Sequence, residues 1–274
     1  MSRYRYFLCM EGATSKRSVY WSVAFVFLLI LGGCSKSKEG KPSKKETPSV
    51  QTETSQREEG YQFVAVKEGG TISGRVVFKG KKPSSTLPAG KDQEVCGKEK
   101  KDPSLTVNER GEVRFAVVQI VDIRKGKAID PVVAVLDQRG CEYHPHVLAV
   151  PAGTTIEILN SDGILHNVHT FSQKNDPFNR AQPKYLKKIT HVFKEPEIIS
   201  VKCDVHGWMS AWIYVAGHPY YDTTTANGAF KLEGVPPGNY TLEVWHEELG
   251  KQRQEVTVGP NESAKVVFEY VIKK

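Results

Sequence analysis

The stretch "CDVHGWMSAW" (Cys203–Trp212) carries a cysteine, a histidine and a methionine at three-residue intervals. It joins two runs with strand-like composition, residues 191–203 before it and 210–217 after it. A tight loop between two strands can aim three such side chains at one point. Thiolate, imidazole and thioether groups together form a donor set that suits a soft transition metal. The spacing therefore predicts a metal-binding loop, with its donors at Cys203, His206 and Met209.

A fourth donor comes from the upstream segment "NSDGILHNVHTF" (Asn160–Phe171), which places His166 in a predicted loop after a strong strand. Two imidazoles and a thiolate with a weak axial thioether make a type 1 copper site. The sequence thus predicts one such copper ion, held by His166, Cys203, His206 and Met209, with the thioether tuning its potential. His206, on a loop expected to be exposed, is the predicted route for electrons.

The rest of the chain has the composition of an all-β protein. Short runs rich in Val, Ile, Thr and aromatic residues alternate with Gly, Pro, Asn and Asp, which favours strands and turns. The runs are residues 71–80, 113–123, 131–137, 146–160, 191–203, 210–217, 228–235, 239–247, 253–259 and 264–272. Because no amphipathic helical period persists for about twelve residues, these runs predict packed β-sandwiches.

The metal-loop features together resemble the cupredoxins, and among them the amicyanin and pseudoazurin-like blue copper proteins. The similar features are the strand "VPAGTTIEILNSD", the tetrapeptide "HNVH" at 166–169, the C-x2-H-x2-M loop and the closing strand "AWIYVAG". The resemblance covers residues 113–217 and implies a Greek-key β-sandwich that transfers electrons and is not an enzyme. Residues 61–112 and the polar segment 172–188 depart from a minimal member of the family.

The same resemblance implies roles for the residues of the tetrapeptide. Its first histidine is the ligand in that family, so His166 carries over and His169 does not. Asn167 is implied to donate its backbone N–H to the thiolate and to hold the two ligand loops together, a supporting role around the metal.

The C-terminal part resembles a second family, the carboxypeptidase regulatory-like domain, a small transthyretin-like sandwich. The stretches "TTANGAF" and "GVPPGNYTL" match its pattern, with Thr225 in place of the usual acid. Its first strand has a counterpart in "GTISGRVVFKG" (Gly70–Gly80), so this distant segment is expected to pair back with the module. The predicted domains are a cupredoxin-like domain over 61–216 with an N-terminal elaboration, and the regulatory-like sandwich over 217–274.

The N-terminal segment has the pattern of an export signal. Four basic residues precede the apolar run Val19–Leu31, which at thirteen residues is shorter than the roughly 20 of a membrane-spanning helix. The sequence "LGGC" resembles the bacterial lipobox, which implies a signal peptide over 1–33 and a lipid on Cys34. Residues 34–60 are polar and charged and predict a disordered tether. The expected location is the bacterial cell envelope, with an unidentified redox protein as partner.

Charge and cysteine content narrow the function further. Residues 1–33 carry four basic residues and one acidic, which leaves 34 basic against 30 acidic, or +4. This balance, with no basic stripe, does not indicate nucleic-acid binding. In an exported protein, disulfides persist. If Cys34 carries lipid and Cys203 binds metal, Cys96 and Cys141 remain as a possible disulfide pair.

Other functions stay open at the sequence level. The same residues could form a zinc site, a nucleophilic cysteine with a histidine base, or a purely structural cluster. At the level of the whole protein, the alternatives to electron transfer are a non-redox scaffold in the envelope and a copper storage or delivery protein.

Overall fold

The computed structural model describes residues 60–81, 85–121, 123–130 and 132–271. Strands dominate this part, and its one helix is the four-residue α1 (Gln93–Cys96), so the predicted all-β class is confirmed. The predicted signal peptide, Cys34 and all of the predicted tether except Gly60 lie outside the described residues. Nowhere in the described part is there a helix with the length and apolar character that crossing a bilayer requires.

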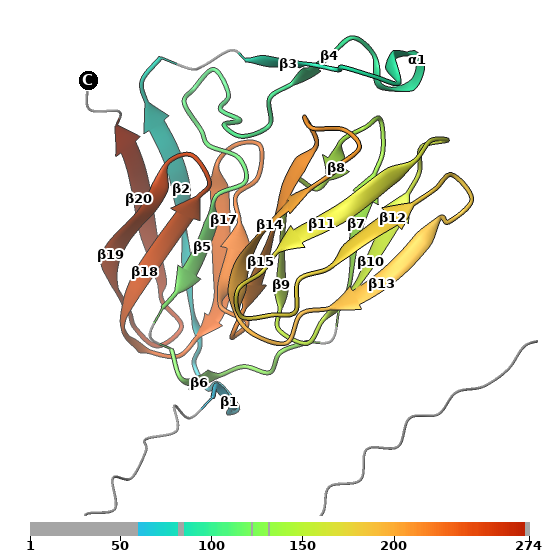
Figure 1. Ribbon diagram of the computed structural model, residues 1–274. Helices are drawn as coiled ribbons and strands as arrows, with labels where there is room; N and C mark the ends of the chain where they lie inside the picture. Colours follow the sequence, from blue (N-terminus) through green and yellow to red (C-terminus); the bar gives the residue numbers. More distant parts are fainter. Residues whose placement is uncertain (1–59, 82–84, 122, 131, 272–274) are drawn as a thin grey trace, which may run out of the picture. The chain divides into compact units, whose positions relative to one another are not determined.

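Residues 133–216 form a first sandwich of two sheets (Figure 1). One sheet has the order β13 (Lys188–Val192), β10 (Thr155–Asn160), β7 (Val133–Gln138), β8 (Tyr143–His144). The other has the order β12 (Asn179–Gln182), β11 (His166–Phe171), β14 (Glu197–Lys202), β15 (Ser210–Ala216), β9 (Val147–Pro151). Alternate residues of both sheets enclose one core, which includes Leu136, Ile156, Ile158, Val168, Ile199, Val201 and Ile213.

Two local predictions for this sandwich are wrong. Residues 146–160 were expected as one strand, but they form β9 and β10 in opposite sheets because a turn with Gly153 at φ 83° separates them. His166 was expected in a loop, but it is the first residue of β11, where it pairs with Gln182 of β12. A strand therefore positions this side chain more rigidly than a loop would.

A second sandwich has a core of its own. Its sheets are β16 (Tyr221–Thr223), β5 (Val117–Ile120), β18 (Gly238–His246), β19 (Gly250–Val258), and β17 (Ala229–Val235), β2 (Gly70–Lys79), β20 (Ser263–Val271). Inward side chains of both sheets, such as Ile72, Val118, Leu232, Leu242 and Phe268, are buried together. The expected pairing of the upstream strand with this module is present: β2 lies between β17 and β20.

The predicted boundary at residue 216 required the two sandwiches to follow each other along the chain, and they do not. Strands β2 and β5 were assigned to the domain 61–216, yet both belong to the second sandwich. The physical reason is edge pairing: β17 and β20 each bond to β2 and not to each other, and β18 bonds to β5. The second sandwich is therefore completed by residues far upstream of the module that the sequence pattern identified.

A small cluster joins the sandwiches. Val117 and Trp245 of the second pack against Val147, Tyr214 and Ala216 of the first. The Glu247 carboxylate bonds to Nε2 of His146, and it accepts the Trp212 indole N–H across 2.7 Å.

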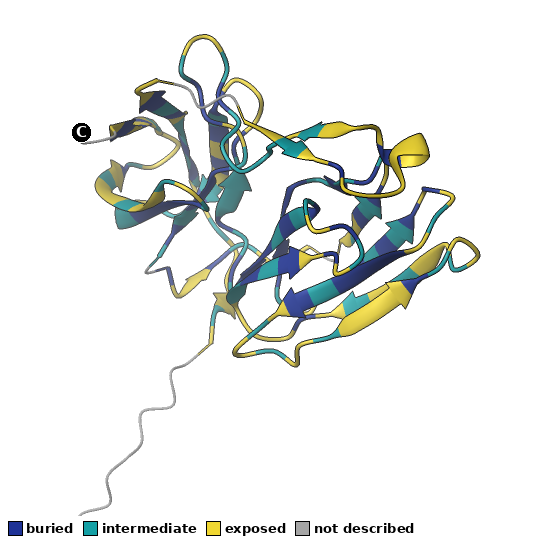
Figure 2. Ribbon diagram, turned by 45° about the horizontal axis from the view of Figure 1, so that its top comes forward, coloured by how far each residue is buried: buried dark blue, intermediate teal, exposed yellow. Residues whose placement is uncertain are grey.

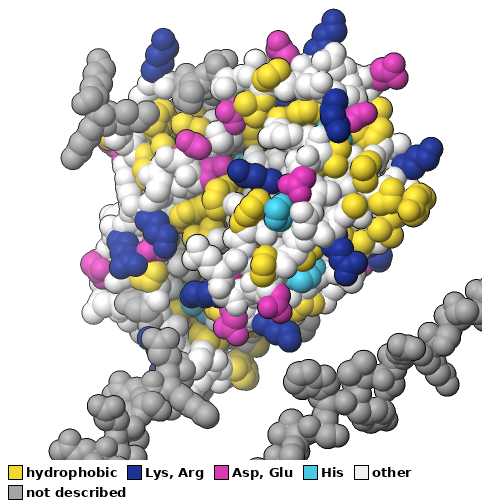
Figure 3. Space-filling view, in the orientation of Figure 1, with side chains coloured by type: hydrophobic (Ala, Val, Ile, Leu, Met, Phe, Trp, Pro, Cys, Tyr) yellow, Lys and Arg dark blue, Asp and Glu magenta, His cyan; other side chains and the backbone are white. Residues whose placement is uncertain are grey.

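Residues 86–101 form an excursion, called the strap below. It contains β3 (Thr86–Pro88), α1 and β4 (Glu99–Lys101), with β3 and β4 paired, and α1 is largely exposed on its outer side (Figure 2). A further two-stranded sheet pairs β1 (Gln62–Phe63) with β6 (Lys125–Gly126). On the face shown in Figure 3, basic and acidic side chains are interspersed.

Candidate metal centre

The two predicted ligand histidines meet inside the first sandwich. Nδ1 of His166, on β11, lies 3.0 Å from Nδ1 of His206, in the loop between β14 and β15. Sγ of Cys203 lies 3.7 Å from the same His206 nitrogen. One donor atom from each of the three residues thus lies within 4.8 Å of the others, close enough for a single metal ion.

Backbone hydrogen bonds close the loop that carries three of the four predicted ligands. The N–H of Met209 donates to the His206 carbonyl across 2.9 Å, and the N–H of Cys203 donates to the Met209 carbonyl across 3.3 Å. Cys203, His206 and Met209 are all buried, and Met209 belongs to the same core cluster as Cys203. The three-residue spacing therefore does turn these side chains inward.

Asn167 has both contacts that were implied for it. Its backbone N–H lies 3.5 Å from Sγ of Cys203, and its side-chain oxygen accepts the backbone N–H of Asp204. His169 lies at the surface instead, where its Nδ1 is 3.0 Å from an Asp204 carboxylate oxygen. Of the two histidines in the tetrapeptide, only His166 faces the cluster.

Two carboxylates fix which nitrogen of each histidine ring carries a proton. Nε2 of His166 is 2.8 Å from Asp162 Oδ2, and Nε2 of His206 is 2.9 Å from Asp92 Oδ2. Since an ionised carboxylate only accepts hydrogen bonds, both Nε2 atoms must donate. In its neutral form, each ring then presents an unprotonated Nδ1, the tautomer that a carboxylate behind a metal-binding histidine favours.

Asp162 is itself held by the tight turn between β7 and β8. Its carboxylate accepts the N–H groups of Gly140 and Cys141, each across 2.8 Å, and both turn residues have positive φ. Burial opposes ionisation, but these donors and the His166 ring outweigh it and hold the pKa of Asp162 below its usual value. Burial also lowers the pKa of His166, which favours the neutral ring.

The donor set fits a cation. Two unprotonated imidazole nitrogens 3.0 Å apart repel each other through their lone pairs, and either a proton or a metal ion between them removes this repulsion. A thiol sulfur adjoins them, and a buried thioether lies in the same core cluster. Two imidazoles with soft sulfur donors match the preference of copper more closely than that of magnesium or calcium, which take oxygen ligands.

The expectation that His206 is exposed is wrong. Its side chain is fully buried, and Asp92 of the strap occupies its Nε2. Trp208 is only partly buried, its ring centroid lies 5.0 Å from that of His206, and its indole N–H donates to the Cys141 carbonyl.

The predicted Cys96–Cys141 pairing is present as a disulfide, with Cα atoms 5.3 Å apart. Cys203 is free and buried, so its sulfur remains available as a ligand.

Three residues that support the candidate ligands are not among the predicted site residues. Asp162 lies four positions before His166 in "SDGILH", so the sequence does place a carboxylate close to this ligand. Tyr143 donates its hydroxyl to the Asn167 carbonyl across 2.6 Å, next to the ligand loops. Asp92 had no detectable signal because it lies 114 positions before its partner His206.

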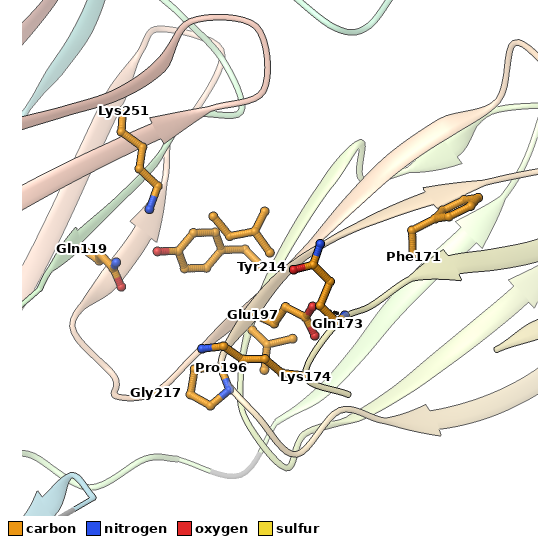
Figure 4. A pocket seen from close by; sticks show the side chains of 11 residues that line it. Gln119, Phe171, Gln173, Lys174, Pro196, Glu197, Tyr214, Gly217 and Lys251 are labelled. Atoms are coloured by element: carbon orange, nitrogen blue, oxygen red, sulfur yellow. Dashed lines mark hydrogen bonds between the residues drawn. The ribbon is translucent and has the colours of Figure 1, made fainter. Parts of the chain in front are cut away.

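Figure 4 shows a pocket elsewhere in the molecule, with a volume of about 480 Å³. Tyr214 of the first sandwich points toward Gln119 and Lys251 of the second. None of the four predicted ligands lines this pocket, so it is separate from the candidate metal centre.

Comparison with known sequences gives one family match. Residues 210–270 match the carboxypeptidase regulatory-like domain, which supports the resemblance seen in the C-terminal sequence. The matched region includes β15, a strand of the first sandwich, and leaves out β2 and β5. No curated protein matches the chain significantly.

Several solved structures are similar to this chain, each over about a third of the chain's length. One is a Cu-containing nitrite reductase from Thermus scotoductus, with 25% identity, 37% of this chain and 26% of that chain covered, and a TM-score of 0.30. A purple cupredoxin from Nitrosopumilus maritimus has 23% identity, with 30% of this chain and 99% of that chain covered and a TM-score of 0.27. Amicyanin from Paracoccus versutus has 20% identity, with 36% of this chain and 97% of that chain covered and a TM-score of 0.28. The chain spans about a quarter of the reductase. With such TM-scores, the functional assignment rests on the side-chain geometry.

Proposed function

We propose that this protein is a type 1 copper protein that transfers single electrons and catalyses no reaction of its own. The observation that carries the proposal is the convergence of His166 Nδ1, His206 Nδ1 and Cys203 Sγ, with both Nε2 atoms engaged by carboxylates. Copper bound there would supply one-electron redox chemistry. Met209 is the proposed axial ligand because it is buried in the same cluster at the end of the same loop.

The chain's own residues favour rapid electron exchange by holding the donors still. Asn167 joins the two ligand-bearing segments, and the Asn167 N–H directed at Cys203 Sγ disperses charge on the thiolate. Little rearrangement is then needed when the charge of the centre changes.

Trp208 is the proposed route for electrons in place of His206. Its ring lies against that of His206 and is partly accessible. Trp208 and Met209 also line a pocket of about 250 Å³, together with Arg114 and His144, where a redox partner could approach the centre.

The first experiment is a Cu(II) titration of the purified protein followed by visible absorption. We expect an intense thiolate-to-copper band that Cys203→Ser abolishes. His166→Ala should also abolish it, whereas His169→Ala, the matched control from the same tetrapeptide, should keep it. A colourless wild-type protein, or equal effects of the two histidine variants, contradicts the proposal.

Voltammetry separates electron transfer from copper storage or delivery. A reversible one-electron couple on the copper-loaded protein supports the proposed function. Tight copper binding without such a couple would favour storage, and a colourless protein that retains zinc would favour the zinc alternative.

The proposed location is the cell envelope, with the protein held by a lipid on Cys34. The "LGGC" sequence supports it, and the Cys96–Cys141 disulfide suits an oxidising compartment. Cys34→Ser should move the protein from the membrane fraction to the soluble fraction. Retention of that variant in the membrane would contradict a lipid anchor.

A further inference from the structure

The strap is attached to the metal sandwich at two points on one turn. Cys96 of α1 forms the disulfide with Cys141, and the Lys100 ammonium group donates to the Gly140 carbonyl across 2.5 Å. The backbone N–H groups of these same two turn residues hold Asp162, the carboxylate behind His166. The turn that anchors the strap thus also positions His166, while Asp92 of the strap contacts His206.

Asp92 departs from what its place at the start of α1 would suggest. An aspartate at this position usually accepts a hydrogen bond from the first turn of its own helix. Here the side chain makes no such bond, and its Oδ2 faces His206 Nε2 instead. The backbone has φ 52°, in the left-handed region that aspartate tolerates better than most residues, and its carbonyl accepts the N–H of Val95 and of Cys96.

Exposure shows what Asp92 and the strap do for the buried ring. The Asp92 side chain keeps 41% of its surface exposed, while the His206 side chain has none. Asp92 therefore lies between His206 Nε2 and the solvent, on the edge of the ring that carries this nitrogen.

We propose that Asp92 is a positioning residue of the metal centre, held over His206 by a strap that the Cys96–Cys141 disulfide latches in place. The inference builds on the proposed function. Asp92 keeps the His206 ring oriented with Nδ1 inward, excludes competing ligands from its outer edge, and adds a negative charge that favours the oxidised, more highly charged metal ion. The disulfide keeps this contact formed.

The first test uses the metal-free protein, so it does not depend on copper binding. Diethyl pyrocarbonate is added, and acylation of His206 is followed by peptide mass spectrometry. We expect His206 to be protected in the wild type and in Glu94→Gln, the matched control that removes a carboxylate from the same helix. Acylation should be at least about tenfold faster in Asp92→Ala and in the Cys96→Ser, Cys141→Ser double variant. Equal protection in all four proteins overturns the inference.

The second test uses the copper-loaded protein and the near-isosteric Asp92→Asn, which leaves the disulfide intact. Loss of a residue that supports a metal-bound histidine typically weakens metal binding about 10- to 100-fold. We expect Cu(II) affinity to fall by this factor and the reduction potential to rise, while Glu94→Gln changes neither. An unchanged potential and affinity in Asp92→Asn would overturn the positioning role.

The two proposals fail in different ways. If the wild type binds no copper but His206 becomes reactive in Asp92→Ala, the electron-transfer function fails and the shielding of His206 by Asp92 stands. If copper binds with the expected spectrum and the Asp92 variants match the wild type in both tests, the electron-transfer function stands and the role of Asp92 fails.

Discussion

The backbone N–H of Asn167 lies 3.5 Å from Sγ of Cys203, 36 positions along the chain. The contact joins strand β11 to the loop after β14, so it links the two segments that supply the candidate ligands. The Asn167 side chain strengthens this link, because it accepts the N–H of Asp204 and donates to Asn179.

Asn167→Ala removes the side-chain bonds and keeps the backbone contact with Cys203. Because Asn167 is buried, we expect the free energy of unfolding to fall by about 1–3 kcal/mol. The copper band should weaken or shift without disappearing. Urea denaturation and absorption spectra measure the two effects. Asn239→Ala, an exposed asparagine of the second sandwich, is the control, and an equal loss in both variants would contradict the role of Asn167.

Glu247 joins the two sandwiches through His146 and the Trp212 indole. Glu247→Ala leaves the buried His146 ring and the partly buried Trp212 indole without this acceptor. We therefore expect the free energy of unfolding to fall by about 1–3 kcal/mol. Calorimetry should also show the two sandwiches unfolding in more separate steps than in the wild type. A single transition at the wild-type temperature would mean that the apolar cluster alone couples them.

Glu243 should make the second sandwich sensitive to acid. Burial alone would raise its pKa, but ion pairs with Lys251 and Arg253, at 2.9 and 2.8 Å, outweigh this and hold the pKa below its usual value. A carboxyl with a depressed pKa in the folded state stabilises the protein above its ordinary pKa of about 4.3, and this stabilisation is lost as pH falls through the folded-state value.

Glu243→Gln is therefore expected to cost about 1.5–3 kcal/mol at pH 7 and progressively less as the pH falls below about 4. Urea denaturation across this pH range measures the difference. Glu255→Gln, at an exposed site on β19, should show little effect at either pH. A constant cost of Glu243→Gln at all pH values would rule out the ionised carboxylate as its origin.

Gly74 tests the assignment of β2 to the second sandwich. A Cβ atom there would lie 1.8 Å from the Val266 carbonyl oxygen of β20 and 2.7 Å from the Phe230 ring of β17. We expect Gly74→Ala to destabilise the second sandwich by about 1–3 kcal/mol or more, read by hydrogen exchange in β17 and β20. Gly163→Ala has open space around it and serves as the control. Unchanged exchange in Gly74→Ala would contradict the position of β2.

Much of the metal loop was predictable because its information is local. Cys203, His206 and Met209 lie within seven positions, and the short turn between the paired strands β14 and β15 brings them together. The all-β class was predictable for a similar reason, since strand composition and turn residues act over a few positions. The match of residues 210–270 to a known domain also follows from contiguous sequence.

The sequence by itself therefore determined the donor types, their spacing and the kind of secondary structure that carries them. Only the tertiary structure decided that β2 and β5 complete the second sandwich, since strand pairing depends on which edges meet in space. Only the tertiary structure brought Asp92 to His206 and so buried a histidine expected at the surface. A contact across 114 positions depends on how the strap folds back and is anchored at Cys141, and no local pattern around either residue encodes it.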